Sequence, residues 1–199
     1  MKPPLDYNIE PYLEWILNCQ IGELSEIKKM LESGYDINTR DDDGLSGLCH
    51  SIEEEEYETS FYLIDHGIEI TVTDLKKACN KENRELVERI ITELNNKVKH
   101  AIEEAFMDFV NLCSYEFLEW YLKKFSPNVN YIGSHQLTAI SEVATNGDLK
   151  KFRFLFECGS DINLRANNGL NTIEWCNEVI ENDGVKEIIK EIKTATNNG

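Results

Sequence analysis

The stretch Gly34–Leu45 reads GYDINTRDDDGL, and the stretch Gly159–Leu170 reads GSDINLRANNGL. Seven of the twelve positions are identical, although the two copies lie 125 residues apart. Chance is a poor explanation for such a match over so long a separation. We therefore predict an architecture built from an internal repeat.

Each copy follows an apolar pattern that is typical of an amphipathic helix. The pattern has the spacing i, i+3, i+6 and i+7, which places apolar side chains on one helix face; its members are Leu24, Ile27, Met30 and Leu31, then Leu149, Phe152, Leu155 and Phe156. Gly34 and Gly159 end these helices, because the residue after a helix end often has φ > 0. From Gly34 to Gly67 is 33 residues, the length of a turn and two helices. Asn38 and Asn163 are expected to brace their own turns.

The stretch from Leu137 to Asn163 resembles an ankyrin repeat. Thr138-Ala139-Ile140-Ser141 stands where that family has Thr-Pro-Leu-His, with Thr138 as the expected helix N-cap. Gly159-Ser160-Asp161-Ile162-Asn163 stands at the family's Gly-Ala-Asp-Val-Asn. The resemblance covers roughly residues 12–193 and is loose in the middle. It implies an all-α helical repeat solenoid of about six helix-turn-helix units, irregular in the middle.

The resemblance also sets the expected domain organisation. We expect one ankyrin-repeat domain over residues 1–199, with approximate repeats 8–38, 39–70, 71–95, 96–130, 131–163 and 164–199. The β-turn finger between the second and third repeats is expected to be lost, because only 27 residues separate Ile64 from Ile91. A helix longer than the family's inner helix is expected from Asn96 to Leu112.

The charge of the chain narrows the class of partner. The formal net charge is -17, and residues 1–60 alone hold 15 Asp and Glu against 4 Lys and Arg. Such a chain repels nucleic-acid phosphates and anionic membrane surfaces, so neither is an expected partner. A basic protein is the natural complement, because opposite fields speed encounter. The alternative is that the acidity only keeps a cytosolic protein soluble.

The six cysteines favour a reducing compartment. None belongs to a CxxC pair or stands near a His at zinc-ligand spacing, and all fall within helical patterns. We interpret them as reduced core thiols, which favours a cytoplasmic location. No stretch approaches 18 apolar residues, and the first residues lack the apolar core of a signal peptide.

Motifs that carry catalysis are absent from the sequence. It contains no GxSxG, no phosphate-binding loop, no HExxH and no CxxC. We therefore expect no enzyme activity, no catalytic residue, no cofactor and no metal. A calcium site at Asp41-Asp42-Asp43 is a weak alternative, because these residues lack the alternating spacing and the distal Glu of a calcium loop.

Two acidic runs are the candidates for binding a partner. Asp41-Asp42-Asp43 lies on the expected finger, and Glu53-Glu54-Glu55-Glu56 ends the next inner helix and enters a turn. In ankyrin proteins the fingers and inner helices form a concave binding face, so the resemblance implies that both runs line one groove. The candidate partner-binding residues are Asp41, Asp42, Asp43, Glu53, Glu54, Glu55, Glu56 and Tyr57. The alternative is a solvated, self-repelling surface.

These observations favour a non-enzymatic protein–protein interaction module that is a monomer when free. An immunity role is known among small acidic bacterial ankyrin proteins, so the resemblance implies an inhibitor of a basic partner such as a bacterial toxin. The alternative is an ankyrin adaptor or effector that binds host or regulatory proteins, and an enzyme is a distant third possibility.

Overall fold

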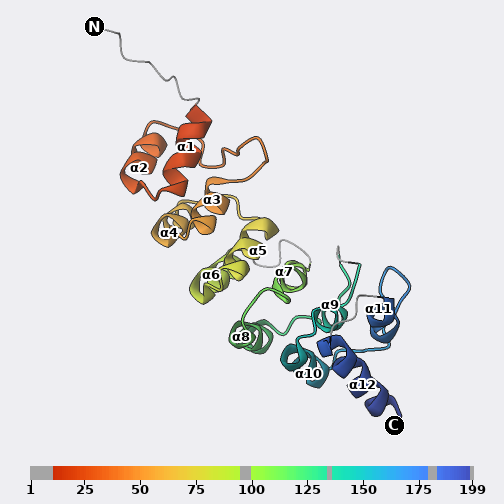
Figure 1. Cartoon of the computed structure of the whole chain (residues 1–199). Helices are drawn as coiled ribbons and strands as arrows, with labels where there is room; N and C mark the ends of the chain where they lie inside the picture. The colour runs from red at the N-terminus through yellow and green to blue at the C-terminus, as the bar shows by residue number, and fades with distance from the viewer. Residues whose placement is uncertain (1–10, 95–99, 134–135, 179–182, 198–199) are drawn as a thin grey trace. The chain divides into compact units, whose positions relative to one another are not determined.

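The computed structural model describes residues 11–94, 100–133, 136–178 and 183–197. These residues form twelve α-helices, and their only β pairing is one antiparallel bridge between Arg40 and Ser46 (Figure 1). The prediction of an all-α fold is confirmed. The helices are α1 Pro11–Gln20, α2 Leu24–Glu32, α3 Gly47–Glu53, α4 Tyr57–Asp65, α5 Val72–Asn80, α6 Arg84–Leu94, α7 Ala101–Phe109, α8 Tyr115–Phe125, α9 Ala139–Thr145, α10 Leu149–Glu157, α11 Thr172–Glu178 and α12 Asp183–Asn197.

The chain divides into two compact units, unit 1 (Met1–Lys97) and unit 2 (Val98–Gly199). Each unit holds three consecutive helix pairs with a short turn inside most pairs, a connection that makes neighbouring helices antiparallel. The expected single domain over residues 1–199 and its six repeat boundaries stay a prediction.

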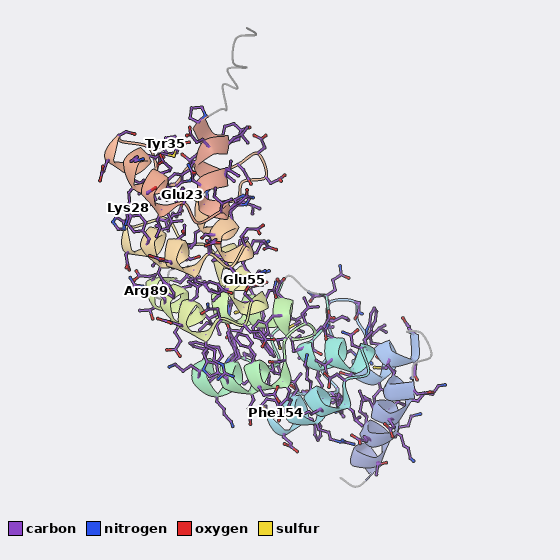
Figure 2. All side chains as sticks on the ribbon, turned by 60° about the vertical axis from the view of Figure 1, so that its left-hand side comes forward. Glu23, Lys28, Tyr35, Glu55, Arg89 and Phe154 are labelled. Carbon is purple, nitrogen blue, oxygen red and sulfur yellow. The ribbon has the colours of Figure 1, made fainter. Side chains whose placement is uncertain are left out.

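In unit 1 the first helix of each pair packs on the first helix of the next. Helix α3 contacts both α1 and α5, and each of the three is paired with its own second helix (Figure 1). Polar contacts link the second helices. Lys28 Nζ of α2 lies 5.2 Å from the ring centre of Tyr62 in α4, and Arg89 of α6 donates to Asp65 at 2.8 Å. Figure 2 shows Lys28 and Arg89 on one side of unit 1.

Local sequence signals mark the helix ends as predicted. Gly34 and Gly159 follow the ends of α2 and α10 with φ of 92° and 93°. The Thr138 hydroxyl accepts a hydrogen bond from the backbone N–H of Ser141, so its role as the N-cap of α9 is confirmed. The Ser46 hydroxyl caps α3 in the same way.

The asparagine of the repeated stretch bridges neighbouring repeats, contrary to our expectation. Asn38 Oδ1 accepts from the backbone N–H of Glu69 at 2.7 Å, one repeat further along the chain. In unit 2 an asparagine outside that stretch, Asn130, makes a similar contact: its Oδ1 accepts from the N–H of Asp161 at 2.8 Å. The turn that contains Asn38 is braced by Asp36, whose Oδ1 atom accepts from the backbone N–H of Asn38. The expectation was wrong for Asn38, because an isolated turn motif does not show what the next repeat places beside it; for Asn163 it stays a prediction.

Unit 2 begins with an aromatic cluster between α7 and α8. Phe109 is fully buried, and its ring meets those of Phe106, Phe117 and Tyr121 at centroid distances of 6.0, 5.3 and 4.8 Å. The expected long helix from Asn96 to Leu112 is wrong within the described residues. Helix α7 begins at Ala101, because His100 has a left-handed φ of 62°, and it has nine residues. The expected start at Asn96 lies outside the described residues.

Between α4 and α5 the connection is short, as the 27-residue spacing predicted. Only residues 66–71 join Asp65 to Val72, and this stretch carries no β bridge. The start of α5 is capped by Asp74, a fully buried carboxylate that accepts from the N–H and the hydroxyl of Thr71, both at 2.7 Å. The hydroxyl of Ser46 also points to Asp74, at 3.2 Å. Adjacent repeats of unit 1 are thus joined through buried polar groups at the helix starts.

All six cysteines are free thiols, but one of them is not a core residue. Five are buried, whereas Cys158 is exposed at the end of α10. Burial raises the pKa of Cys19 to about 12 and that of Cys176 to about 11. Burial and the neighbouring Asp74 carboxylate raise the pKa of Cys49 to about 12.

We expect native iodoacetamide treatment to add one group, at Cys158, because a thiol must be accessible to react. Mass spectrometry of the intact protein and of its tryptic peptides measures this. After denaturation all six thiols should react, and Cys158→Ser should remove the native adduct. Rapid modification of Cys19 or Cys49 in the native protein would contradict the core placement.

Candidate functional site

The first acidic run lies on a short β-turn finger, Arg40–Ser46, between α2 and α3. The backbone N–H of Asp41 donates to Leu45 at 3.0 Å, and that of Gly44 donates to Asp41 at 3.0 Å. Gly44 has a φ of 77°, which a glycine adopts without strain. The predicted position of Asp41, Asp42 and Asp43 on a finger is therefore observed.

Asp41 is a structural residue of this finger. Its Oδ1 atom accepts from the backbone N–H groups of Asp43 at 3.0 Å and Leu45 at 2.8 Å. Its Oδ2 atom lies 2.6 Å from Nε2 of His50, in α3. Burial alone would raise the pKa of Asp41, but these hydrogen bonds outweigh it and hold that pKa below its ordinary value. Asp41 therefore ties the finger to α3, and its role in binding a partner stays a prediction.

His50 connects the finger to the first helix as well. Its Nδ1 atom lies 3.1 Å from the amide nitrogen of Gln20, at the end of α1. An amide nitrogen only donates, so Nδ1 accepts and Nε2–H donates to Asp41. This chain from α1 through α3 to the finger holds the finger against the inner helices of unit 1.

Asp42 and Asp43 occupy the tip of the finger, and both are exposed. The Tyr12 hydroxyl of α1 approaches Asp42 Oδ2 at 3.4 Å, a long contact at an exposed position. These two carboxylates therefore remain accessible at the tip.

The second acidic run forms the turn between α3 and α4, as predicted. Glu53 ends α3 and its Oε2 atom lies 2.5 Å from Lys77 Nζ, a hydrogen bond that lowers the pKa of Glu53. Glu55 has a φ of 64° and lies 3.4 Å from Lys81 (Figure 2). Both ion pairs reach across to the next repeat, so part of the charge in this run is compensated within unit 1.

The two other glutamates of this run differ in their exposure. Glu54 is the C-cap residue of α3 and is exposed. Glu56 precedes α4, and its carboxylate packs so closely on Gly22 that a Cβ there would lie 2.3 Å from Oε2. Glu54 is therefore the member of the run that is most open to a partner.

Tyr57, the last candidate, is half-buried at the start of α4. Burial raises its pKa, while a hydrogen bond with Asn83 in the turn before α6 lowers it in part. The side chain thus bridges two repeats, and its role in unit 1 is at least partly structural.

Sequence reasoning missed the residues that organise these carboxylates. His50, Lys77 and Lys81 contact these carboxylates, and Gln20 of α1 contacts His50. A repeat alignment is the one signal that finds such residues, because it places equivalent positions of adjacent repeats side by side.

A second finger with the same backbone lies in unit 2, Arg165–Leu170. The N–H of Ala166 donates to Leu170 at 3.0 Å, and that of Gly169 donates to Ala166 at 2.9 Å, as at Asp41 and Gly44 of the first finger. The residues that match Asp41-Asp42-Asp43 are Ala166-Asn167-Asn168. The finger therefore forms without any carboxylate at its tip.

The residues that the structure describes contain no group of three or more His, Cys, Asp or Glu side chains that could hold a metal ion. A cavity of about 200 Å³ between α10 and α12 is lined by Phe152, Phe156, Ile162 and Ile192, and by charged residues that include the ion pair of Arg153 with Glu191. Across the described helices, none is long and apolar enough to cross a membrane.

No family model matches the chain. A curated relative, the Transient receptor potential protein of Drosophila melanogaster, is 32% identical over 109 residues. The match covers 47% of this chain and 8% of that protein, so it spans a small part of that protein's length.

Solved structures resemble most of the chain. The ankyrin repeat protein EF0377 matches 90% of this chain and 96% of its own, with a TM-score of 0.69 and 17% identity. An ankyrin repeat domain of Acinetobacter baumannii matches 92% and 97%, with a TM-score of 0.67 and 15% identity. The chain therefore has the ankyrin-repeat fold, as the sequence predicted.

A third similar structure is a complex. It contains the predatory endopeptidase Bd0816 of Bdellovibrio bacteriovorus and the immunity protein Bd3460. A chain of that complex matches 88% of this chain and 96% of its own, with a TM-score of 0.66 and 18% identity.

Proposed function

We propose that this chain is a non-enzymatic protein-binding module, an acidic inhibitor whose first finger and α3–α4 turn bind a basic protein. Asp42, Asp43 and Glu54 supply the exposed charge, while Asp41, Glu53, Glu55 and Tyr57 hold the surface in shape. The partner class is a basic toxin domain, and the module acts as the matching immunity protein in the cytoplasm.

The observation that carries this proposal is the comparison of the two fingers. Both have the same backbone hydrogen bonds, yet one tip carries Asp42 and Asp43 and the other carries Asn167 and Asn168. Folding therefore does not require the carboxylates at positions 42 and 43. Exposed like charges on one tip repel each other, so binding is the better explanation for their presence.

The distribution of charge supports the same surface. The sequence of unit 1 carries a net charge of -12, and that of unit 2 carries -5. Helix α3 joins the finger to the turn and, with seven residues, is about 10 Å long. Asp42 lies on the finger that leads into this helix and Glu54 caps its far end, so we infer that one partner meets both.

The fold supports a binding role without identifying the partner. Ankyrin-type stacks present an extended surface for other proteins and have no built-in catalytic centre. One similar chain comes from a complex of an endopeptidase with an immunity protein, which supports the inhibitor reading for this chain. The free thiols support a reducing compartment.

Charge reversal at the two ends of α3 tests the proposal. We expect Asp42→Lys with Glu54→Lys to weaken binding of the captured basic partner by about tenfold or more, because close opposite charges couple strongly across interfaces. Affinity capture from the source cells identifies the partner, and surface plasmon resonance measures both rate constants. The association rate of the wild-type protein should fall as salt rises, since the Debye length is about 8 Å at physiological strength.

A matched control changes the same charge elsewhere. Glu178→Lys with Glu187→Lys alters two exposed glutamates of unit 2 and should leave affinity within about twofold of the wild type. Equal losses of affinity in the two double variants, or an association rate that does not change with salt concentration, would show that the first finger is not the binding surface. A partner with an acidic surface would overturn the proposed partner class.

A further inference from the structure

Helix α1 carries a row of exposed apolar side chains. Leu13, Leu17 and Ile21, the last just after the helix, are 46%, 45% and 58% exposed. Trp15 and Cys19, on the other side of the same helix, are fully buried. Residues four apart lie above one another on a helix, so the three side chains form one ridge about 12 Å long.

This ridge is not explained by the ordinary scatter of apolar residues on a surface. Among the described residues only five large hydrophobic side chains are exposed, and three of them form this ridge; the other two are Leu112 and Phe156, in unit 2. A single exposed leucine needs no explanation, but a contiguous apolar patch indicates an interaction site. The inner helices α3 and α5 expose no such row.

The charges around the ridge indicate which kind of partner can bind it. Residues 11–27 contain Glu14, Glu23 and Glu26 and no Lys or Arg. Glu14 and Glu23 are exposed, and Glu56 lies against Gly22 at the end of the ridge (Figure 2 labels Glu23). A second copy of this chain would bring carboxylates against carboxylates. A partner with an apolar face and cationic flanks would complement both features.

We propose that Leu13, Leu17 and Ile21 dock a basic amphipathic helix of the partner protein. A row of residues four apart is the ridge that fits between the rows of a second helix in the commonest class of helix packing. The partner helix would place apolar residues at i, i+3, i+4 and i+7 against the ridge. Its Lys or Arg side chains would face Glu14 and Glu23. This inference rests on the proposed function and adds an apolar anchor to its charged surface.

A synthetic peptide pair tests the inference without knowledge of the partner. The probe is a fluorescein-labelled Leu/Lys peptide of about 18 residues, long enough for five helical turns, with all leucines on one face. Its control is a scrambled peptide of the same composition with no apolar face, which measures binding by charge alone. Fluorescence anisotropy at physiological salt gives the affinity of the full-length protein for each peptide.

We expect the amphipathic peptide to bind about tenfold more tightly than the scrambled one, because buried apolar anchors dominate interface affinity. The triple variant Leu13→Ser, Leu17→Ser and Ile21→Ser should abolish this preference. Leu112→Ser, which removes an exposed leucine of unit 2 (76% exposed), should keep it. Hydrogen exchange confirms that the variants remain folded.

Equal binding of the two peptides, or an unchanged preference in the triple variant, would overturn the inference. A wild-type dimer in light scattering that the triple variant loses would also overturn it, because a second copy would then be the occupant. The captured partner separates this failure from failure of the proposed function. If Asp42→Lys with Glu54→Lys weakens binding of the partner and the triple variant does not, the acidic surface is the binding surface and the ridge is not part of it.

Discussion

Phe109→Ala is expected to destabilise unit 2 by about 3–5 kcal/mol, the range found when a buried phenylalanine is truncated. The Phe109 ring is fully buried and meets Phe106, Phe117 and Tyr121 in edge-on contacts. Truncation removes its hydrophobic contribution and leaves a cavity that three large rings cannot readily fill. This range already includes the lost aromatic pairs, which are worth about 0.5–1.5 kcal/mol each beyond the buried area.

The measurement must resolve the two units, because an array of repeats need not unfold as one cooperative block. Hydrogen exchange followed by mass spectrometry, on peptides from residues 101–125, reports the local free energy of opening. Phe156→Ala is the matched control in the same unit, because that ring is 43% exposed, and it should cost less than about 1 kcal/mol. Equal losses at Phe109 and Phe156 would contradict the placement of the aromatic cluster.

Local signals in the sequence were enough to predict the repeat and the residues that begin and end its helices. Gly34 and Gly159 end helices with positive φ because their neighbours form the same turn in both copies. Thr138 caps its helix because the acceptor and donor are three residues apart. Interactions of this kind depend on a few adjacent residues, so their pattern can be seen in the sequence.

Contacts between repeats were not predictable in the same way. Asn38 was expected to brace its own turn, yet it accepts from Glu69, 31 residues later. The sequence marked Glu53-Glu54-Glu55-Glu56 as one acidic run, but Lys77 and Lys81 neutralise two of its four members from the next repeat. Which lysines face a given carboxylate depends on how adjacent repeats are stacked, and a loosely matching middle repeat leaves that register open.

The candidate site likewise contains features that the sequence predicted and features that depend on contacts between elements. The sequence placed Asp42 and Asp43 on a finger, and the structure does too. The distinction between Asp41, which builds the finger, and Asp42, which is displayed on it, needed the position of His50. The apolar ridge on α1 was missed because Leu13 and Leu17 follow a helical period that also describes core residues; only their exposure separates them from Trp15.

The sequence also does not reveal close packing at a glycine whose backbone φ is ordinary. Gly47 is the first residue of α3, is buried and lies against α1. A Cβ at this position would lie 2.6 Å from Cys19 Sγ and 3.0 Å from Trp15 Nε1. Both neighbours are fully buried, so neither can move into solvent. Gly47 therefore sets how closely the first two inner helices approach.

Gly47→Ala is expected to destabilise unit 1 by about 1–3 kcal/mol, because an added methyl group overpacks the contact with α1. The sign is informative, since alanine stabilises an unobstructed helix position by about 0.5–1 kcal/mol relative to glycine. Hydrogen exchange on peptides from α1 and α3 gives the change. Cys19→Ala removes the Sγ atom that the new methyl group meets, so the double variant should be more stable than the sum of the two single losses implies. In this double-mutant cycle, the loss in the double variant should be smaller than the sum of the two single losses by at least about 0.5 kcal/mol. A Gly47→Ala variant as stable as the wild-type protein, or strictly additive losses, would show that α1 and α3 are not in the close contact described.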